Sequence, residues 1–250
     1  MLAAGSALAR MTRFRAVARR TCCRLMRPCV SGAILQWCTL LARRLGLAVL
    51  LGFPCLAGAA STLVVFGDSI SAGYGLPQGA GWVSLLSARM AKAAPDYKVV
   101  NASISGETLA GGRRRIESVL DQHKPAVVIV ELGGNDGLRG MPIDTIESDL
   151  AAIVDACLRR KARVVLLGMR LPPNYGAAYV KRFEQVYAAV AQKRPVTFVP
   201  FLFAGFGERQ DFFQPDGIHP TREAQPLMLE SVWKPLATLI TQGAHAQARK

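Results

Sequence analysis

The chain has 250 residues, a formal net charge of +14 and 51% hydrophobic residues. Nine of its 31 basic residues lie within residues 1–60, a stretch without acidic residues, so residues 61–250 carry only about +5. A charge of that size is ordinary for a globular domain, and no basic stripe with interleaved aromatic residues follows, so nucleic-acid binding is not expected. We expect the short cluster Arg113–Arg115 to be a solvated helix face.

The first part of the chain has the pattern of an export signal. Arg43 and Arg44 precede an uncharged apolar run, Leu45–Ala60, which is shorter than the roughly 20 residues that span a bilayer. The run ends in the small-x-small cleavage pattern Ala57-Gly58-Ala59. We therefore expect residues 1–59 to be an export signal region, residues 60–250 to be one folded domain, and the mature protein to be periplasmic or secreted.

Other interpretations of this N-terminal region stay open. An uncleaved segment would be a membrane anchor, and an arginine-rich start without acids also fits a mitochondrial transit peptide, although serine is scarce. Cys55 would suit a lipoprotein, but Pro54 stands where a small residue should precede a lipidated cysteine. Residues 1–25 are long for a bacterial signal, so translation could start at Met11 or Met26.

Cysteine usage excludes a disulfide framework in the mature domain. Five of the six cysteines precede the expected cleavage site, which leaves Cys157 alone. One cysteine can build neither a disulfide nor a metal site. Cys157 lies in a helical pattern beside Val154 and Leu158, so we expect it in the core.

The mature region alternates between short apolar runs and amphipathic stretches. The apolar, β-branched runs predict strands at Thr62–Phe66, Lys98–Ala102, Ala126–Leu132, Arg163–Met169 and Thr197–Pro200. The stretches between and after them predict helices at Trp82–Ala94, Leu109–His123, Ile143–Lys161, Tyr175–Arg194 and Thr221–Thr241. We expect Pro226 and Pro235 to interrupt the last of these helices. Such alternation predicts an α/β domain with a parallel sheet and helices on both faces.

Polar and glycine-rich segments follow three of the predicted strands. They are Gly67-Asp68-Ser69, Asn101–Gly106 and Gly133–Gly137. Ligands of parallel sheets bind outside the carboxyl ends of the strands, so these segments should share one edge. A fourth polar cluster, Asp216–His219, comes just before the last helix.

Ser69 is the candidate nucleophile, and it needs a base. Of the three histidines in the mature region, His123 ends a helix and His245 lies in a polar tail, which leaves His219 as the candidate. Asp216, three residues earlier, can fix the imidazole tautomer, as a triad requires. The alternative is that Asp216 belongs to a plain turn and His219 caps a helix.

Gly106 and Asn135 are candidate donors to an oxyanion, together with the backbone N–H of Ser69. Each alone would also suit an ordinary turn. We expect Asp68 to be a hydrogen-bonding group of its turn and Asp136 to cap the loop that follows it. The Gly-x-Ser-x-Gly motif of standard α/β-hydrolases is absent. The first strand is also not followed by the Gly-x-Gly-x-x-Gly motif for dinucleotides or by the Walker lysine motif for phosphates.

Taken together, the segments FGDSISAGYG, VVNASISGETLAGG, VELGGNDGLRG, RLPPNYG and DGIHPTREAQP resemble the SGNH/GDSL hydrolase superfamily. They are most similar to its bacterial thioesterase I/protease I/lysophospholipase branch and the related arylesterases, over about residues 62–239. Ile70 stands where the family motif has leucine. The resemblance implies a three-layer α/β/α, flavodoxin-like fold, and residues 60–250 as the hydrolase domain. It also implies that about residues 137–142 move when an acyl chain binds.

The resemblance also implies roles for single residues: Ser69, Asp216 and His219 as the triad, and Ser69, Gly106 and Asn135 as the oxyanion hole. It implies hydrolysis of acyl esters and thioesters without a metal or organic cofactor. Residues in or near the site loops could line an acyl groove or be plain core: Leu109, Leu138, Met141, Ile143, Leu171 and Tyr175.

We expect a monomer whose substrates are small or lipid esters, with membranes involved only in export or as a source of substrate. Two other functions stay open. One is a carbohydrate O-acetylesterase of the same superfamily. The other is a non-catalytic periplasmic protein that binds lipid or glycan in the same pocket.

Overall fold

The computed structural model describes residues 60–247, with side chains for residues 60–241. The expected export signal of residues 1–59 lies outside the described residues, and so does the side chain of His245. Within residues 60–247, no helix combines the length and the apolar composition needed to cross a membrane.

Five parallel strands form the centre of the domain. In sheet order β2-β1-β3-β4-β5, they are β2 (Tyr97–Asn101), β1 (Ser61–Gly67), β3 (Val127–Glu131), β4 (Arg163–Leu167) and β5 (Thr197–Val199). The unbroken apolar runs form strands that are covered on both faces, and every residue of β3 is buried. The five predicted strands are confirmed, with ends that differ by one or two residues.

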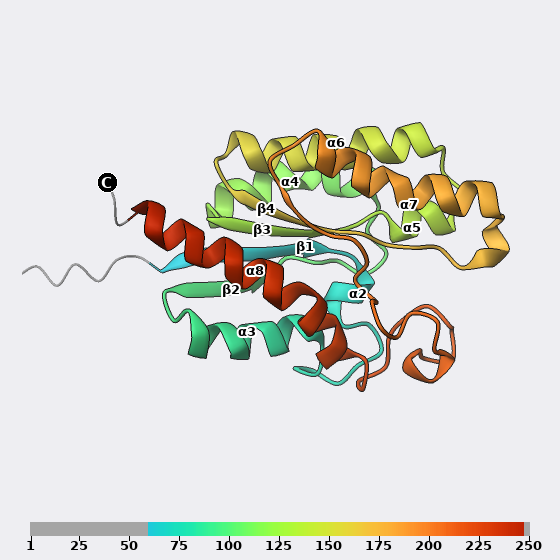
Figure 1. Cartoon of the computed structure of the whole chain (residues 1–250), viewed down its shortest axis with the longest axis horizontal. Coiled ribbons are helices and arrows are strands. Elements are labelled where there is room, and N and C mark those ends of the chain that lie inside the picture. The colour runs from blue at the N-terminus through green and yellow to red at the C-terminus, as the bar shows by residue number, and fades with distance from the viewer. Residues whose placement is uncertain (1–59, 248–250) are drawn as a thin grey trace, which may run out of the picture. The chain divides into compact units, whose positions relative to one another are not determined.

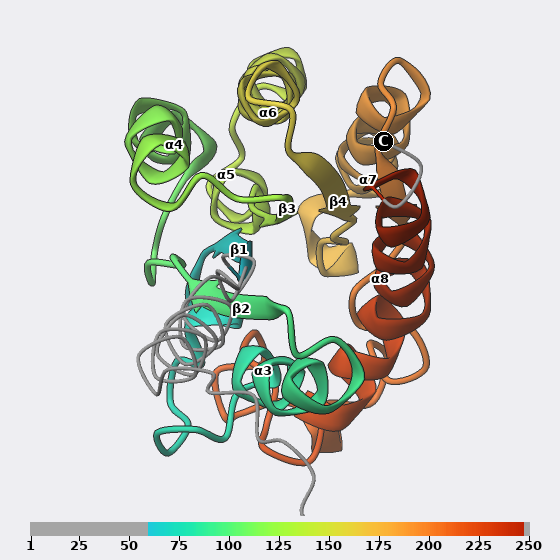
Figure 2. The same cartoon turned by 90° about the vertical axis from the view of Figure 1, so that its left-hand side faces the viewer.

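Helices cover both faces of the sheet (Figures 1 and 2). One layer contains α4 (Leu109–His123), α6 (Ile143–Arg159) and α7 (Ala177–Gln192), and the other contains α3 (Trp82–Ala93) and α8 (Gln225–Gln247). This arrangement is the expected three-layer α/β/α sandwich.

Helix α6 shows how the pattern of apolar residues produces the layers. Ile146, Leu150, Ile153 and Cys157 recur every three or four residues and are buried against the core. Burial raises the pKa of the Cys157 thiol to about 12. Cys157 is therefore an inert core residue, as the sequence predicts.

The predicted course of the last helix is wrong in two respects. Helix α8 begins at Gln225, so Pro226 occupies its first turn, where a missing N–H leaves no helical hydrogen bond unmade. Pro235 lies inside the continuous helix rather than interrupting it. Val232 and Leu236, on either side of Pro235, are fully buried, and this packing holds the helix across the proline.

The order of the strands reverses direction at β1. The chain passes from β1 to β2 on one side and then returns to β3 on the other side of β1. At such a reversal the loops after the two inner strands diverge, and ligands bind between them. Gly67 and Glu131 are register partners at the carboxyl ends of β1 and β3, so the reversal lies at the Gly67-Asp68-Ser69 segment.

Candidate active site

Ser69 is held at this reversal by a tight strand-to-helix junction. A methyl group on Gly67 would lie 2.7 Å from the Oε2 atom and 2.9 Å from the carbonyl oxygen of Glu131, so only glycine fits there. Asp68 caps the short helix α2 (Ser69–Ala72), because its Oδ1 atom accepts from the N–H of Ile70 at 3.0 Å. The expected structural role of Asp68 is confirmed, and Ser69 is the first residue of α2.

The buried carboxyl group of Glu131, which was not singled out from the sequence, supports this junction. Glu131 is fully buried, and its Oε2 atom accepts from the Ser71 hydroxyl at 2.6 Å and from the Asp68 N–H at 3.4 Å. Its Oε1 atom has no hydrogen-bond partner among the described residues. Burial, together with the negative charge of Asp68, raises the pKa of Glu131 well above its ordinary value. Burial likewise raises the pKa of Asp68, to about 6.

These pKa shifts predict a pH dependence of stability. Because the folded-state pKa of Glu131 is raised, its contribution is fully present below the unfolded pKa and is lost as pH rises through the folded pKa. Glu131→Gln removes this titration while it keeps the shape of the side chain. We expect the free energy of unfolding of the wild type, measured with urea, to fall relative to that of the variant as pH rises above about 4.5, the ordinary pKa of a glutamate.

The matched control is Glu208→Gln, which changes an exposed glutamate. Its stability difference from the wild type should stay nearly constant with pH. A constant difference for Glu131→Gln as well would show that Glu131 does not titrate in this range.

The Asp216–His219 segment forms the tip of a hairpin-like loop. Phe213 and Pro220 form an antiparallel bridge, and the Gln214 N–H donates to the His219 carbonyl at 2.7 Å. At the tip, Gly217 has a φ of 67°, a left-handed conformation that glycine adopts readily. The Oδ1 atom of Asp216 accepts from the N–H groups of Ile218 and His219 at 2.9 and 3.0 Å. The loop therefore positions Asp216, the candidate orienting carboxylate, and His219, the candidate base.

The loop brings these side chains to Ser69. The Nδ1 atom of His219 lies 2.7 Å from Asp216 Oδ2, and its Nε2 atom lies 2.8 Å from the Ser69 hydroxyl, 150 residues away in sequence. An ionised carboxylate only accepts hydrogen bonds, so the imidazole carries its proton on Nδ1. Nε2 then accepts from the Ser69 hydroxyl, which is the geometry that a general base requires.

The charge of Asp216 is stabilised although its side chain is partly covered. Burial alone would raise its pKa, but the N–H groups of His219 and Ile218 and the His219 ring outweigh that effect and lower it. Asp216 is thus an anion at neutral pH, as an orienting carboxylate must be.

Two further residues beside His219 were not singled out from the sequence. The exposed ring of Tyr74 packs on the His219 imidazole, with 4.5 Å between ring centroids. The side-chain amide of Gln214 donates to the Tyr74 carbonyl at 2.9 Å and to the Pro220 carbonyl at 3.2 Å. Gln214 therefore joins the histidine loop to the segment that follows α2.

The candidate oxyanion donors come from the loops after β2 and β3. Gly106 is exposed and has a φ of 79°, and within residues 60–247 neither its N–H nor that of Ser69 has a hydrogen-bond acceptor. Asn135 lies in the short helix α5 (Gly134–Leu138), where the sequence predicts a loop. Its Nδ2 atom donates to Asp68 Oδ2 at 3.1 Å and to the Glu107 carbonyl at 3.0 Å.

The partners of Asn135 place it between the other two donors. Asp68 directly precedes Ser69, and Glu107 directly follows Gly106, so the Asn135 amide bridges the two segments that contain the free N–H groups. Both amide hydrogens are engaged in this state. A negative oxygen that forms during the reaction would either share one of these amide hydrogens or displace Asp68 or Glu107 as its acceptor.

The residues expected to line an acyl groove differ in their burial. Leu109 is completely buried and Leu171 and Ile143 nearly so, all within the main core cluster; for these three the groove interpretation is corrected to core. Leu138 and Tyr175 are half-buried, and Met141 is exposed. The segment at residues 137–142, which the resemblance implies to be movable, begins in α5 and includes an exposed turn.

The role expected for Asp136 is also corrected. Its Oδ2 atom accepts from the N–H of Leu109 at 2.9 Å, at the start of α4, and not from the loop that follows it. Asp136 is buried, so it links the β3 loop to the neighbouring helix instead of capping its own segment.

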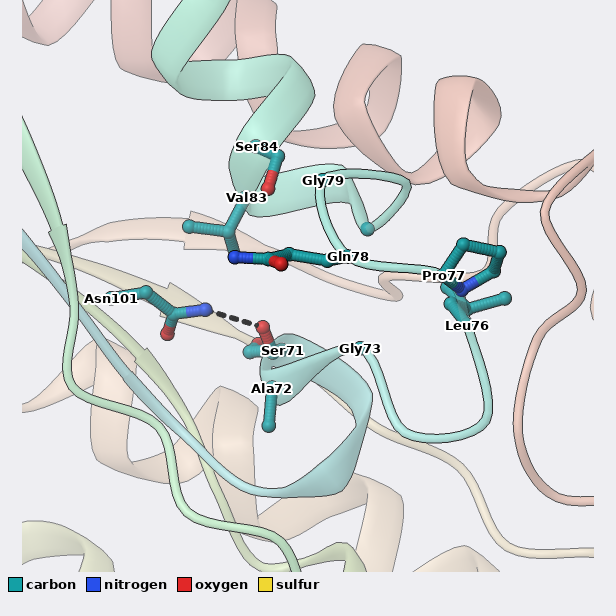
Figure 3. A pocket seen from close by; sticks show the side chains of 11 residues that line it. Ser71, Ala72, Gly73, Leu76, Pro77, Gln78, Gly79, Val83, Ser84 and Asn101 are labelled. Atoms are coloured by element: carbon teal, nitrogen blue, oxygen red, sulfur yellow. Dashed lines mark hydrogen bonds between the residues drawn. The ribbon is translucent and has the colours of Figure 1, made fainter.

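A cavity of about 220 Å³ lies between α2, the start of α3 and the end of β2 (Figure 3). Its walls include Ser71, Gln78, Ser84 and Asn101, and the Asn101 amide donates to the Ser71 carbonyl at 2.8 Å. None of Ser69, Asp216 and His219 lines this cavity, so it is separate from the place where the three side chains meet.

A serine, a histidine and an aspartate joined in this way on an α/β/α sandwich define a serine hydrolase. Comparison with known proteins agrees, because the model of the GDSL-like Lipase/Acylhydrolase family matches residues 65–226. The chain belongs to this family, as the sequence motifs indicate.

Named relatives support the same assignment. The chain is 50% identical over 182 residues to Esterase TesA of Pseudomonas aeruginosa, which covers 73% of this chain and 90% of that protein. It is 41% identical over 184 residues to Thioesterase 1/protease 1/lysophospholipase L1 of Escherichia coli, covering 74% and 87%. The crystal structure of the esterase EstA from Pseudoalteromonas sp., inhibited by monoethylphosphonate, has a TM-score of 0.68 at 35% identity, covering 72% of this chain and 99% of that one.

Proposed function

We propose that Ser69, His219 and Asp216 act as a catalytic triad that hydrolyses acyl esters and thioesters through an acyl-enzyme. The observation that carries this proposal is the continuous chain of two short contacts, 2.8 Å from Ser69 to His219 and 2.7 Å from His219 to Asp216. A cap and a turn alone would not require the imidazole to meet the hydroxyl of Ser69, which follows the first strand.

In the proposed mechanism the Ser69 oxygen attacks the acyl carbonyl carbon while His219 Nε2 takes the hydroxyl proton. The carbonyl π electrons move to the oxygen, which the N–H groups of Ser69 and Gly106 and the Asn135 amide stabilise. His219 then protonates the leaving alcohol or thiol as its bond to the carbonyl carbon breaks. Water, deprotonated by His219, attacks the acyl-enzyme and releases the acid and the free serine.

The surroundings of the triad favour apolar substrates. Three of the five exposed large hydrophobic side chains among the described residues belong to segments that contact the triad residues or adjoin them, Tyr74, Ile104 and Ile218, and a fourth, Met141, belongs to the segment that follows α5. We propose that they contact the acyl or aryl part of the substrate, with Leu138 and Tyr175 behind them. Lipid esters such as lysophospholipids, together with aryl esters and acyl thioesters, are the proposed substrate class.

Asn135→Ala tests the oxyanion site. Loss of one preorganised donor should lower kcat by on the order of 10²–10³, since the donor acts most strongly on the charged intermediate. The measurement is steady-state hydrolysis of p-nitrophenyl esters. Gln122→Ala, which removes an exposed side-chain amide near the end of α4, is the control. An unchanged kcat for Asn135→Ala would remove this residue from the oxyanion site.

The first experiment is stoichiometric labelling with a fluorophosphonate, followed by mass spectrometry of the labelled peptide. Attachment of one phosphonyl group at Ser69 supports the enzyme, whereas a binding protein would stay unlabelled. Hydrolysis rates for a series of p-nitrophenyl esters, from acetate to long acyl chains, then distinguish the proposed enzyme from a carbohydrate O-acetylesterase. A preference for longer chains supports the proposed substrates, and activity confined to acetate favours a carbohydrate O-acetylesterase.

We further propose that residues 1–59 export the domain of residues 60–250 to the periplasm or the medium, where it acts as a monomer. Support comes from the apolar run and small-x-small pattern at Leu45–Ala60. N-terminal sequencing of the protein recovered outside the cytoplasm tests the expected cleavage after Ala59. Light scattering of the mature protein tests its oligomeric state.

A further inference from the structure

Arg115 is not part of a solvated helix face, contrary to the expectation for the Arg113–Arg115 cluster. Its side chain is only 24% exposed, whereas Arg114 beside it is exposed. The Arg115 guanidinium packs over the Phe66 ring at 4.3 Å from the ring centroid. Phe66 belongs to β1 and is fully buried, so the arginine is anchored on the core of the sheet.

The polar contacts of Arg115 hold both ends of one loop. Its Nη1 atom donates to the Ala102 carbonyl at 2.8 Å, and its Nε atom donates to Glu107 Oε2 at 3.0 Å. The residues between these two contacts include Gly106, whose N–H is a proposed oxyanion donor. The loop is therefore fixed at its first and last residues by a single side chain from α4.

The same loop also positions the side-chain amide of Asn135, the second candidate donor. The Glu107 carbonyl accepts from Asn135 Nδ2, so any shift of Glu107 moves or frees the Asn135 amide. Glu107 itself has little freedom, because its carboxylate is 12% exposed and ion-paired. A methyl group on Gly111 would lie 2.0 Å from Glu107 Oε1, so glycine in the first turn of α4 leaves room for that carboxylate.

We propose that Arg115 is a positioning residue of the oxyanion site. It touches no substrate atom. It acts through the 102–107 loop by holding the Gly106 N–H and, through Glu107, the Asn135 amide in the geometry that stabilises the negative oxygen. This inference rests on the proposed function, since it assigns a purpose to the loop only if Ser69 hydrolyses esters. Arginine suits the task because its planar fork reaches two acceptors in fixed directions.

Arg115→Met tests the proposal, because methionine keeps much of the apolar packing on Phe66 and removes every donor. We expect kcat to fall about 10- to 100-fold with little change in KM, since small displacements of catalytic groups have effects of that size. Arg115→Lys should recover part of the loss, because it can reach one acceptor but not both. Arg114→Met, an exposed neighbour on the same helix, should behave like the wild type.

A double-mutant cycle separates positioning from a merely structural role. If Arg115 acts on the donors, Arg115→Met should cost much less in an Asn135→Ala background than in the wild type. Full additivity, or equal kcat for Arg115→Met and Arg114→Met, would overturn the proposal. Glu107→Gln offers a second test if Arg115→Met fails to fold, and it should lower kcat as well. An unchanged kcat for Glu107→Gln would also overturn the proposal.

Failure of the proposed function would look different from failure of this inference. A wild type that neither hydrolyses esters nor reacts with the fluorophosphonate contradicts the function itself. A fully active wild type whose Arg115→Met variant is equally active contradicts only the role of Arg115.

Discussion

Ser69→Ala is expected to abolish ester hydrolysis, lowering kcat by on the order of 10⁶. In the proposed mechanism the hydroxyl oxygen forms the bond of the acyl-enzyme, and without it the imidazole and the oxyanion donors have no nucleophile to assist. The loss should appear in kcat for every ester tested, and fluorophosphonate labelling should disappear with it.

The folded structure should survive this change. Ser69 is half-buried at the start of α2, and the cap of that helix comes from Asp68, not from the serine hydroxyl. The near-ultraviolet circular dichroism spectrum and the urea midpoint should match those of the wild type within error. Ser118→Ala, on the exposed face of α4, is the matched control and should remain fully active. Retention of more than about a tenth of the activity by Ser69→Ala would refute the nucleophile assignment, since triad loss costs far more.

Asp216→Asn should lower kcat by about 10⁴, the second largest effect we expect. The amide oxygen can still accept from the Ile218 and His219 N–H groups, so the loop should keep its shape. The amide nitrogen, however, would face His219 Nδ1 and donate to it. His219 would then carry its proton on Nε2, which could no longer accept the serine proton.

The control for charge alone is Asp211→Asn in the preceding segment. Asp211 is exposed and pairs with Arg209, so its loss should change kcat little. Thermal unfolding of both variants checks that the histidine loop is intact. A fall in kcat of less than tenfold for Asp216→Asn would mean that the carboxylate does not set the tautomer.

Features that depend only on neighbouring residues in the sequence could be predicted well. The unbroken apolar runs of β1 and β3 and the amphipathic period of α6 specify strands and helices without reference to the rest of the chain. The polar segments after the strands could be assigned to one edge, because parallel strands leave no other arrangement. Ser69 was identified for this reason, whereas His219 was identified by elimination among three histidines and Asp216 by its spacing from His219; the structure brings the three together.

The interactions that support the site depend on contacts between distant segments. Glu131 reads as a lone acid at the end of an apolar strand, and nothing in the sequence says that it meets Ser71, 60 residues away. Arg115 lies in a run of three arginines, and only the close approach of α4 to the 102–107 loop distinguishes it from Arg114. A buried acid at a strand end was the available signal for Glu131, because such a position is unusual for an unpaired carboxyl group.

The effect of the prolines on the last helix and the direction of single side chains were the least predictable features. Pro235 was expected to interrupt α8, but the tertiary packing of Val232 and Leu236 keeps the helix continuous. Leu109 was placed near the site because it follows the donor loop, yet its side chain points into the core. In both cases packing outweighed the local pattern.

The distance along the chain between the serine and its histidine has a consequence for biosynthesis. The serine is synthesised 150 residues before the histidine to which it bonds. A nascent chain, or one still threading through a translocation channel, would therefore display the hydroxyl without its proton acceptor. Hydrolytic capacity would therefore arise only after the C-terminal part of the domain has been synthesised and has docked.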